Sequence, residues 1–151
     1  MSPNDGAVTN PSYRQVCSGS TGHVEVLKVE LNEPAKHFEE FIRFFYMYHD
    51  PTTKNRQGND TGSQYASHIF TYDEDQDRIA RAVTIELQGK LSRGEISAYE
   101  DATINTSITK ANAFYPAEQE HQDYLAKNPG GYCNHYFRFK EWPSNPASPS
   151  N

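Results

Sequence analysis

Long hydrophobic runs are missing from this chain of 151 residues, and no stretch approaches the roughly 20 apolar residues that a membrane-spanning helix needs. The first ten residues, MSPNDGAVTN, have neither an apolar core nor a basic flank, so they do not predict a secretory signal peptide. Lysine and arginine are scattered and number 14 against 20 acidic residues, which gives no basic patch for nucleic acid. We therefore expect a cytoplasmic protein that binds neither membranes nor nucleic acids.

Cysteine is also scarce. Cys17 and Cys133 are the only two, they lie far apart, and they form no Cys-x-x-Cys pair. This argues against a zinc site and against a secreted domain held together by disulfides. Hydrophobic residues make up only 35% of the chain, whereas aromatic residues reach 13%. The length suits one domain, and its core should be built largely from aromatic rings.

One polar stretch, Tyr48–Phe70, lies between two apolar segments and is rich in turn-forming residues. Pro51 keeps Asp50 out of helical geometry, so a helix should end here. Gly58 and Gly62 permit backbone angles that other residues avoid. The stretch carries many hydrogen-bonding side chains: His49, Asp50, Asn55, Arg56, Gln57, Asn59, Asp60, Gln64, Tyr65 and His68. It is either a structured functional loop or an ordinary long connection with a solvated surface.

Hydrophobic periodicity outside this stretch predicts strands that alternate with helices. We expect strands at 23–31, 65–72 and 102–108, and helices at 35–48, 73–90 and 117–125. Asp73 should cap the second helix, whose first turn is acidic as the helix dipole favours. The pattern predicts a small α+β domain over 13–142, with a flexible segment at 1–12 and a disordered tail at 143–151.

Two features leave alternatives open. Glu25 shares a strand face with apolar residues, so it lies either at a solvent-exposed strand end or partly buried, with a raised pKa suited to proton transfer. His49, Asp50 and His68 are potential metal ligands, but a His-Asp-Pro sequence more simply ends a helix and braces the loop. We therefore predict no metal site.

Three motifs together resemble one family, peptide methionine sulfoxide reductase A. They are NPSYRQVCSGSTGHVEV at 10–26, HDPTTKNRQGNDTGSQYASHIF at 49–70 and AEQEHQDYLAKNPGGYC at 117–133. The similarity keeps one order and register from Asn10 to His135. The resemblance implies a ferredoxin-like two-layer α+β sandwich. It also implies an enzyme of protein repair, which reduces the S epimer of methionine sulfoxide, free or in proteins, to methionine.

The resemblance further implies a mechanism. In the family a cysteine thiolate attacks the sulfoxide sulfur, a carboxylic acid protonates the oxygen, and two tyrosine hydroxyls hold that oxygen. A second cysteine then resolves the sulfenic acid as a disulfide, which thioredoxin reduces. By this match the site residues are the acid Glu25, the oxygen-holding Tyr13 and Tyr65, the resolving Cys133, and the substrate-binding Asp60 and His49. No cofactor is implied, because the electrons come from thioredoxin or dithiothreitol.

The family's nucleophile lies in a Gly-Cys-Phe-Trp-Gly motif, which these 151 residues do not contain. Cys17 matches a position where many members have a cysteine that is not the nucleophile. We therefore expect the sandwich to lack its first strand and helix, and the chain alone to be inactive or severely impaired. Exposed sheet edges should lower stability or favour self-association through the gap. The alternative function is a non-catalytic module that binds oxidised methionine or thioredoxin.

Overall fold

The structure, a computed structural model, describes residues 2–3 and 8–144. Two long helices form one layer: α2 spans Pro34–Tyr48 and α3 spans Glu74–Ser92. Both helices are confirmed to within two residues at each end. Asp73 caps α3 as predicted, because its side chain accepts a hydrogen bond from the backbone N–H of Gln76 (2.8 Å).

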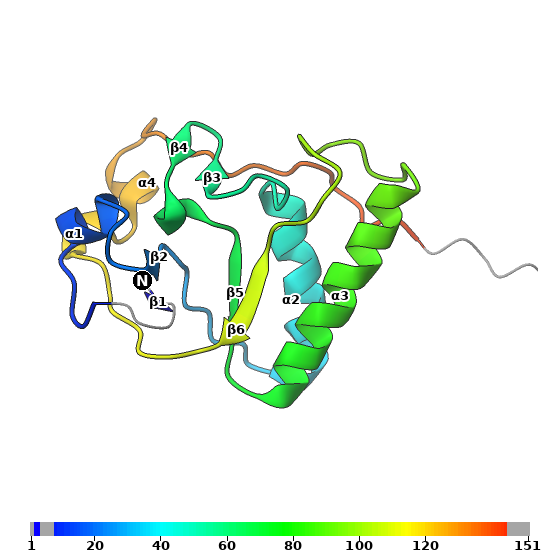
Figure 1. The fold of residues 1–151 in the computed structure, drawn as a ribbon, viewed down its shortest axis with the longest axis horizontal. Coiled ribbons are helices and arrows are strands. Elements are labelled where there is room, and N and C mark those ends of the chain that lie inside the picture. Colours follow the sequence, from blue (N-terminus) through cyan, green and yellow to red (C-terminus); the bar gives the residue numbers. More distant parts are fainter. Residues whose placement is uncertain (1, 4–7, 145–151) are drawn as a thin grey trace, which may run out of the picture.

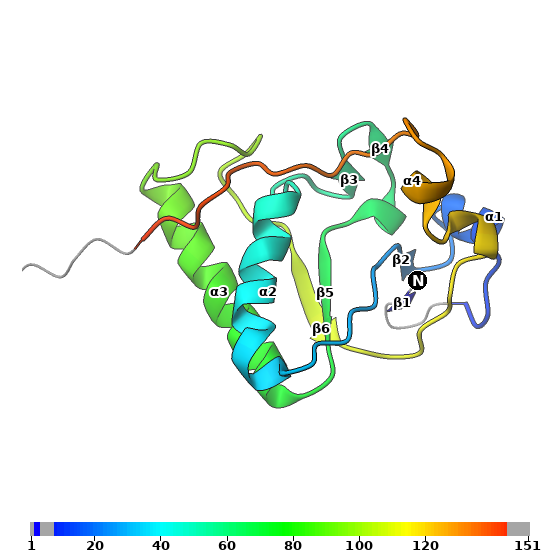
Figure 2. The ribbon, with the colours of Figure 1, turned by 180° about the vertical axis from the view of Figure 1, so that it is seen from behind.

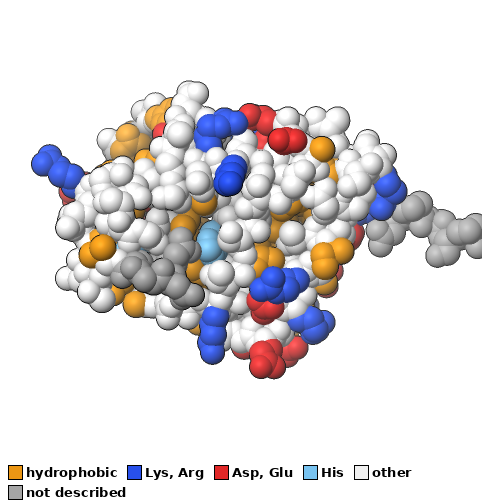
Figure 3. Space-filling model, viewed as in Figure 1, with side chains coloured by type: hydrophobic (Ala, Val, Ile, Leu, Met, Phe, Trp, Pro, Cys, Tyr) orange, Lys and Arg blue, Asp and Glu red, His pale blue; other side chains and the backbone are white. Residues whose placement is uncertain are grey.

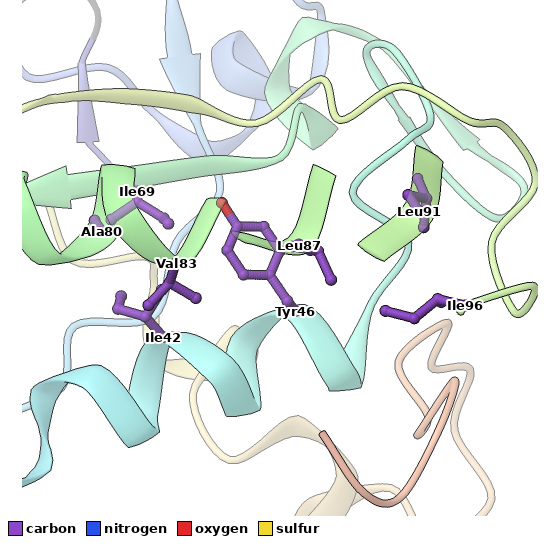
Figure 4. Packing of buried hydrophobic residues seen from close by; sticks show 8 residues of the cluster. All are labelled: Ile42, Tyr46, Ile69, Ala80, Val83, Leu87, Leu91 and Ile96. Atoms are coloured by element: carbon purple, nitrogen blue, oxygen red, sulfur yellow. The ribbon is translucent and has the colours of Figure 1, made fainter. Parts of the chain in front are cut away.

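The hydrophobic core lies mainly between these two helices. Figure 4 shows its buried side chains: Ile42, Tyr46, Ile69, Ala80, Val83, Leu87, Leu91 and Ile96. Tyr46 is completely buried, and its hydroxyl forms a hydrogen bond with Thr84 Oγ1 on α3 (2.6 Å). Other rings pack around this cluster: Phe38, Phe45, Tyr99, Phe139 and Trp142. The expectation of a core that relies on rings is therefore confirmed in part, alongside aliphatic residues of α3.

The second layer is a pair of parallel strands, β5 (His68–Thr71) and β6 (Ser107–Lys110). α2 and α3 cover one face of this pair (Figures 1 and 2). The strand expected at 65–72 is confirmed only in its second half, because the chain forms a 3-10 turn, η1 (Ser63–Tyr65), just before it. Mixed helices and strands make the fold α+β, as predicted.

The strand expected at 102–108 is wrong over its first part, since β6 begins only at Ser107. A side chain of α3 replaces a strand as the partner of the earlier residues. Gln88 Nε2 donates to the carbonyl of Ala102 (2.8 Å), and Gln88 Oε1 accepts from the N–H of Ile104 (2.9 Å). Because these backbone groups already have hydrogen-bond partners, they do not need those of a neighbouring strand.

The strand expected at 23–31 is wrong beyond its first two residues. β2 contains only His23–Val24, which pair antiparallel with β1 (Ser2–Pro3). The following segment runs beside β5 towards α2 without joining a ladder (Figures 1 and 2), and Leu27 is 86% exposed. A strand needs a hydrogen-bonded neighbour, which alternation in the sequence alone does not supply. Among the described residues, the strands form three two-stranded pairs.

The helix expected at 117–125 is replaced by two short turns, η2 (Gln119–His121) and α4 (Tyr124–Lys127). Asp123 separates them in the left-handed conformation, with φ of 53°. The Lys127 ammonium group donates to the carbonyl oxygens of Gln119 (2.8 Å) and Gln122 (2.6 Å). These carbonyls would otherwise accept hydrogen bonds within a continuous helix, so a side chain stabilises the break.

The polar stretch Tyr48–Phe70 contains a structured loop, which agrees with the first of the two interpretations in its structural part. β3 (Arg56–Gln57) pairs antiparallel with β4 (Asp60–Thr61). Gly58, in the turn between them, has φ of 55°, which glycine adopts without strain. Asp50 and Gln57 are buried, and Gln57 Nε2 donates to the carbonyl of Asp50 (2.6 Å). Buried polar side chains thus hold the loop together.

Part of the segment expected to be flexible has defined contacts. Val8 N–H donates to the carbonyl of Thr21 (3.0 Å), and Pro11 is buried. Residues 1, 4–7 and 145–151, which include most of the expected tail, lie outside the described residues. No helix within the described ranges combines the length and the apolar character required to cross a membrane.

Candidate active site

The first site residue, Tyr13, begins a five-residue helix, α1 (Tyr13–Cys17). Ser12 and Gln15 form a capping box: the Ser12 hydroxyl accepts from the Gln15 N–H (3.4 Å), and Gln15 Oε1 accepts from the Ser12 N–H (2.8 Å). Periodicity does not predict so short a helix. One turn separates Tyr13 from Cys17, so the phenol and the thiol share a helix face.

A distant segment holds Tyr13 in place. The Tyr13 N–H donates to Glu118 Oε1 (3.0 Å). The Tyr13 ring stacks on His121, with 3.7 Å between the ring centroids and 18° between the planes. Both contacts join residues more than 100 positions apart, so no local sequence pattern indicates them.

Three segments meet at η1, which carries Tyr65. Gln64 Nε2 donates to the carbonyl of Cys17 (3.1 Å), which ties η1 to α1. The Glu25 N–H donates to the carbonyl of Gln64 (2.9 Å), which ties η1 to the segment after β2. Glu25 is therefore fixed beside Tyr65 by its backbone, although β2 ends one residue before it.

Glu25, Asp60 and the two tyrosines lie close enough for their charges to change one another's pKa values. Desolvation, followed by the negative charge of Asp60, raises the pKa of Glu25 above its ordinary value. The surface of Glu25 remains open to solvent, which limits this effect. Burial and then the charge of Glu25 raise the pKa of Tyr65. The Cys17 side chain, followed by burial, raises the pKa of Tyr13. Both phenols thus keep their protons and remain donors.

Tyr13 and Glu25 line an open pocket of about 690 Å³. Its other walls come from the segment after Glu25 and from the segment that holds Tyr13: Val26, Leu27, Lys28, Phe114, Pro116, Ala117, Gln119, His121 and Gln122. The mixture of apolar and hydrogen-bonding groups suits a small polar ligand with an apolar part. On the face that Figure 3 shows, basic and acidic side chains are interspersed.

Asp60 and Cys133 lie on segments that are joined by one amide. Asn134 Nδ2 donates to Asp60 Oδ2 (2.5 Å) and to the carbonyl of Gln57 (2.8 Å). Cys133, the neighbour of Asn134 in the chain, is exposed, and neither Cys17 nor Cys133 is in a disulfide. The structure therefore places the exposed thiol next to the loop that carries Asp60. Asn134, Glu118 and His121 were not among the predicted site residues.

His49 is the predicted site residue that the structure places elsewhere. It is only 4% exposed. Its Nδ1 lies 2.6 Å from the carbonyl of Phe45, so Nδ1–H donates there, and Nε2 accepts from the hydroxyl of Ser67 (2.8 Å). Both ring nitrogens of His49 are engaged with protein groups, so these contacts do not support its assignment to substrate binding, which stays a prediction. His49 ends α2 and braces the loop, as the simpler interpretation held.

The free energy of unfolding should fall as the pH drops from about 6.5, the ordinary histidine value, towards 4. Burial lowers the pKa of His49 to about 4. Above both values the ring is neutral in both states; between them, only the unfolded chain binds the proton. Protonation of the unfolded chain alone lowers the free energy of unfolding by up to about 1.4 kcal/mol per pH unit. Urea unfolding at several pH values should show a smaller slope for His49→Gln.

His37→Gln is the matched control, since His37 lies half-exposed on the same helix. It should keep the pH slope of the parent chain. His68, whose pKa burial also lowers to about 4, contributes equally in all three proteins. Equal slopes for the parent chain and His49→Gln would contradict the prediction.

No group of three or more His, Cys, Asp or Glu side chains within residues 2–3 and 8–144 is placed to hold a metal ion. His49 and His68 have different hydrogen-bond partners. His68 Nε2 bonds with Thr109 Oγ1 on β6 (2.8 Å), whereas His49 bonds with Phe45 and Ser67.

Sequence comparisons agree with this geometry. A family model described as peptide methionine sulfoxide reductase matches residues 4–145. The chain is 47% identical over 128 residues to the peptide methionine sulfoxide reductase MsrA of Vibrio cholerae, which covers 85% of this chain and 58% of that protein. It is 43% identical over 133 residues to a probable peptide methionine sulfoxide reductase of Schizosaccharomyces pombe, covering 87% and 74%.

Solved structures give the same result. Mxr1 from Saccharomyces cerevisiae in reduced form superimposes with a TM-score of 0.75 at 36% identity, covering 91% of this chain and 71% of that one. Methionine sulfoxide reductase A of Corynebacterium diphtheriae gives 0.72 at 39% identity, covering 85% and 62%. The chain thus spans about three-fifths of the length of its bacterial relatives. With matches of this extent in sequence and fold, the chain belongs to the peptide methionine sulfoxide reductase family.

Proposed function

We propose that this chain carries the sulfoxide-binding part of a peptide methionine-(S)-sulfoxide reductase. The observation that carries the proposal is the convergence of Glu25, Tyr13 and Tyr65 from three separate segments. A protonated carboxyl and two phenols are hydrogen-bond donors suited to a sulfoxide oxygen, which bears partial negative charge. The raised pKa of Glu25 extends its protonated form to higher pH.

In the proposed reaction, the thiolate of the family's Gly-Cys-Phe-Trp-Gly motif, which these 151 residues do not contain, attacks the sulfoxide sulfur and forms a bond to it while Glu25 protonates the oxygen. The hydroxyl is then transferred to the cysteine sulfur as the bond between the two sulfurs breaks, so methionine leaves and the cysteine becomes a sulfenic acid. Cys133 attacks this sulfenic acid and forms a disulfide with loss of water, and thioredoxin or dithiothreitol reduces the disulfide. The exposure of Cys133 supports its access to a partner protein. Free thiols at both cysteines are also in keeping with a cytoplasmic location.

We also propose that these residues form an incomplete version of the family's ferredoxin-like sandwich. The segment after β2 lies beside β5 without ladder hydrogen bonds, and its Leu27 and Val29 are exposed. A further strand between them would complete one sheet. In its absence, a second copy of the chain could occupy the same edge, which favours self-association.

The proposal predicts that the chain binds methionine-S-sulfoxide more tightly than methionine. Glu25→Ala or Tyr65→Phe should each weaken sulfoxide binding about fivefold, the effect of one hydrogen bond worth about 1 kcal/mol. Binding should also weaken as the pH rises through the raised pKa of Glu25, because the carboxylate no longer donates. Isothermal titration calorimetry measures both effects.

Tyr136→Phe is the matched control, because Tyr136 is exposed, its hydroxyl accepts from the Arg138 side chain, and neither residue lines this pocket. It should leave sulfoxide affinity unchanged. Equal affinities of the parent chain for the sulfoxide and for methionine would exclude recognition of the oxygen and with it this proposal.

A second candidate function is a non-catalytic module that binds oxidised methionine or thioredoxin. It is favoured by the retention of Glu25, Tyr13 and Tyr65 in a chain of 151 residues without a Gly-Cys-Phe-Trp-Gly motif. A module that binds oxidised methionine shares the binding step with the first candidate, so turnover distinguishes these two.

A further inference from the structure

Among the described residues, the segment around η2 makes a hydrogen bond and a ring stack with Tyr13. Glu118 accepts from the backbone N–H of Tyr13 (3.0 Å), and the His121 ring stacks on the Tyr13 ring at 3.7 Å. One contact fixes the main chain of the tyrosine, and the other fixes the plane of its ring. Together they leave the phenol little freedom of orientation.

Tyr13 needs such support. It is the first residue of a helix of only five residues, and short helices are marginal on their own. The N–H groups of the first turn have no partner within a helix. Ser12 satisfies the N–H of Gln15, whereas Glu118 satisfies that of Tyr13. The hydrogen bond from Tyr13 also lowers the pKa of Glu118, so the carboxylate remains charged at neutral pH.

Glu118 and His121 act as one unit. They are three residues apart, which is one turn of a 3-10 helix, and the His121 N–H donates to the carbonyl of Glu118 (2.9 Å). Lys127 holds the same turn through the carbonyl of Gln119 (2.8 Å). His121 also lines the pocket together with Tyr13 and Glu25. The turn η2 therefore forms part of the pocket wall and also holds Tyr13 in place.

We infer that Glu118 and His121 are positioning residues, which orient the Tyr13 hydroxyl towards a sulfoxide oxygen bound beside Glu25. This inference rests on the proposed function, because it assumes that Tyr13 binds the oxygen. A hydrogen bond weakens steeply as its geometry departs from linear, so releasing the ring should cost about as much affinity as removing the hydroxyl.

The test compares affinities for methionine-S-sulfoxide by calorimetry. Glu118→Ala, His121→Ala and Tyr13→Phe should each lower affinity about fivefold. Glu118→Gln keeps an acceptor oxygen and His121→Phe keeps a stacking ring, so both should restore most of the loss. Glu120→Ala, an exposed neighbour in the same turn, should have no effect.

Double variants separate positioning from a general loss of structure. In a Tyr13→Phe background, Glu118→Ala and His121→Ala should cause little further loss, because the group they orient is already absent. Losses that simply add in the double variants would overturn the inference.

A second readout does not depend on sulfoxide binding. The 13C resonance of the labelled Tyr13 ring should shift in His121→Ala, since the stacked imidazole is lost, and return in His121→Phe. If the parent chain does not prefer the sulfoxide, the proposed function fails, and this resonance still tests the contact. An unchanged resonance in His121→Ala would show that the stack does not form.

Discussion

Reduction of methionine-S-sulfoxide by this chain with dithiothreitol should not exceed the uncatalysed background. In the proposed site, Glu25, Tyr13 and Tyr65 would hold and protonate the oxygen, but the reaction needs a thiolate at the sulfur. In the serine protease subtilisin, removing the nucleophile of a covalent mechanism lowers kcat by about a millionfold. Oxygen binding alone leaves no route to a sulfenic acid. The assay follows methionine formation by chromatography.

Cys17 and Cys133 are the thiols that could contradict this expectation, so Cys17→Ser and Cys133→Ser belong in the same assay. Cys17 is the last residue of α1 and shares a helix face with Tyr13. Cys133 is exposed on the segment that Asn134 anchors to Asp60. Turnover that disappears in only one of the two variants would identify that cysteine as the nucleophile. The second candidate function would then be excluded.

Asp50→Ala should lower the free energy of unfolding by about 3 kcal/mol, since it leaves several buried donors without a partner. The Asp50 carboxylate is completely buried. It accepts from the N–H (2.9 Å) and the hydroxyl (2.5 Å) of Thr52, and from the N–H of Glu100 (2.9 Å). These hydrogen bonds join the start of the polar loop to the connection after α3. Denaturant unfolding measures the loss.

Asp75→Ala provides the matched control. Asp75 lies exposed in the first turn of α3 and forms an ion pair with Arg78 (3.2 Å) at the surface. Surface pairs of this kind contribute about 0.2–1 kcal/mol. Equal losses for Asp50→Ala and Asp75→Ala would show that the buried network does not stabilise the loop.

Local signals in the sequence were sufficient for α2 and α3. Each has an apolar stripe at helical spacing, and α3 also has Asp73 as its cap and acidic residues in its first turn. Their formation depends mainly on residues within one turn of each other. The same reasoning failed at 117–125, where helix-forming residues are present but Lys127 and the left-handed Asp123 stabilise two separate turns.

Strands were harder to predict, for a physical reason. The alternation at 23–31 describes a chain that can pair, but pairing requires a neighbour from another part of the sequence. Only His23–Val24 finds one among the described residues. His49 shows the same limit for a side chain. The family resemblance implied a substrate-binding residue, but no local pattern indicated that the ring would be buried with its nitrogens on Phe45 and Ser67.

The sequence by itself determined the family and the two long helices, and it predicted Glu25, Tyr13, Tyr65, Asp60 and Cys133 as site residues. Motifs and helical periodicity depend on residues that are close in the sequence, so they can be recognised without the structure. Only the tertiary structure decided which of these residues meet and what holds them. Glu118 and His121 reach Tyr13 across more than 100 residues, and Asn134 reaches Asp60 across 74. Such contacts depend on how the whole chain packs, which no local pattern encodes.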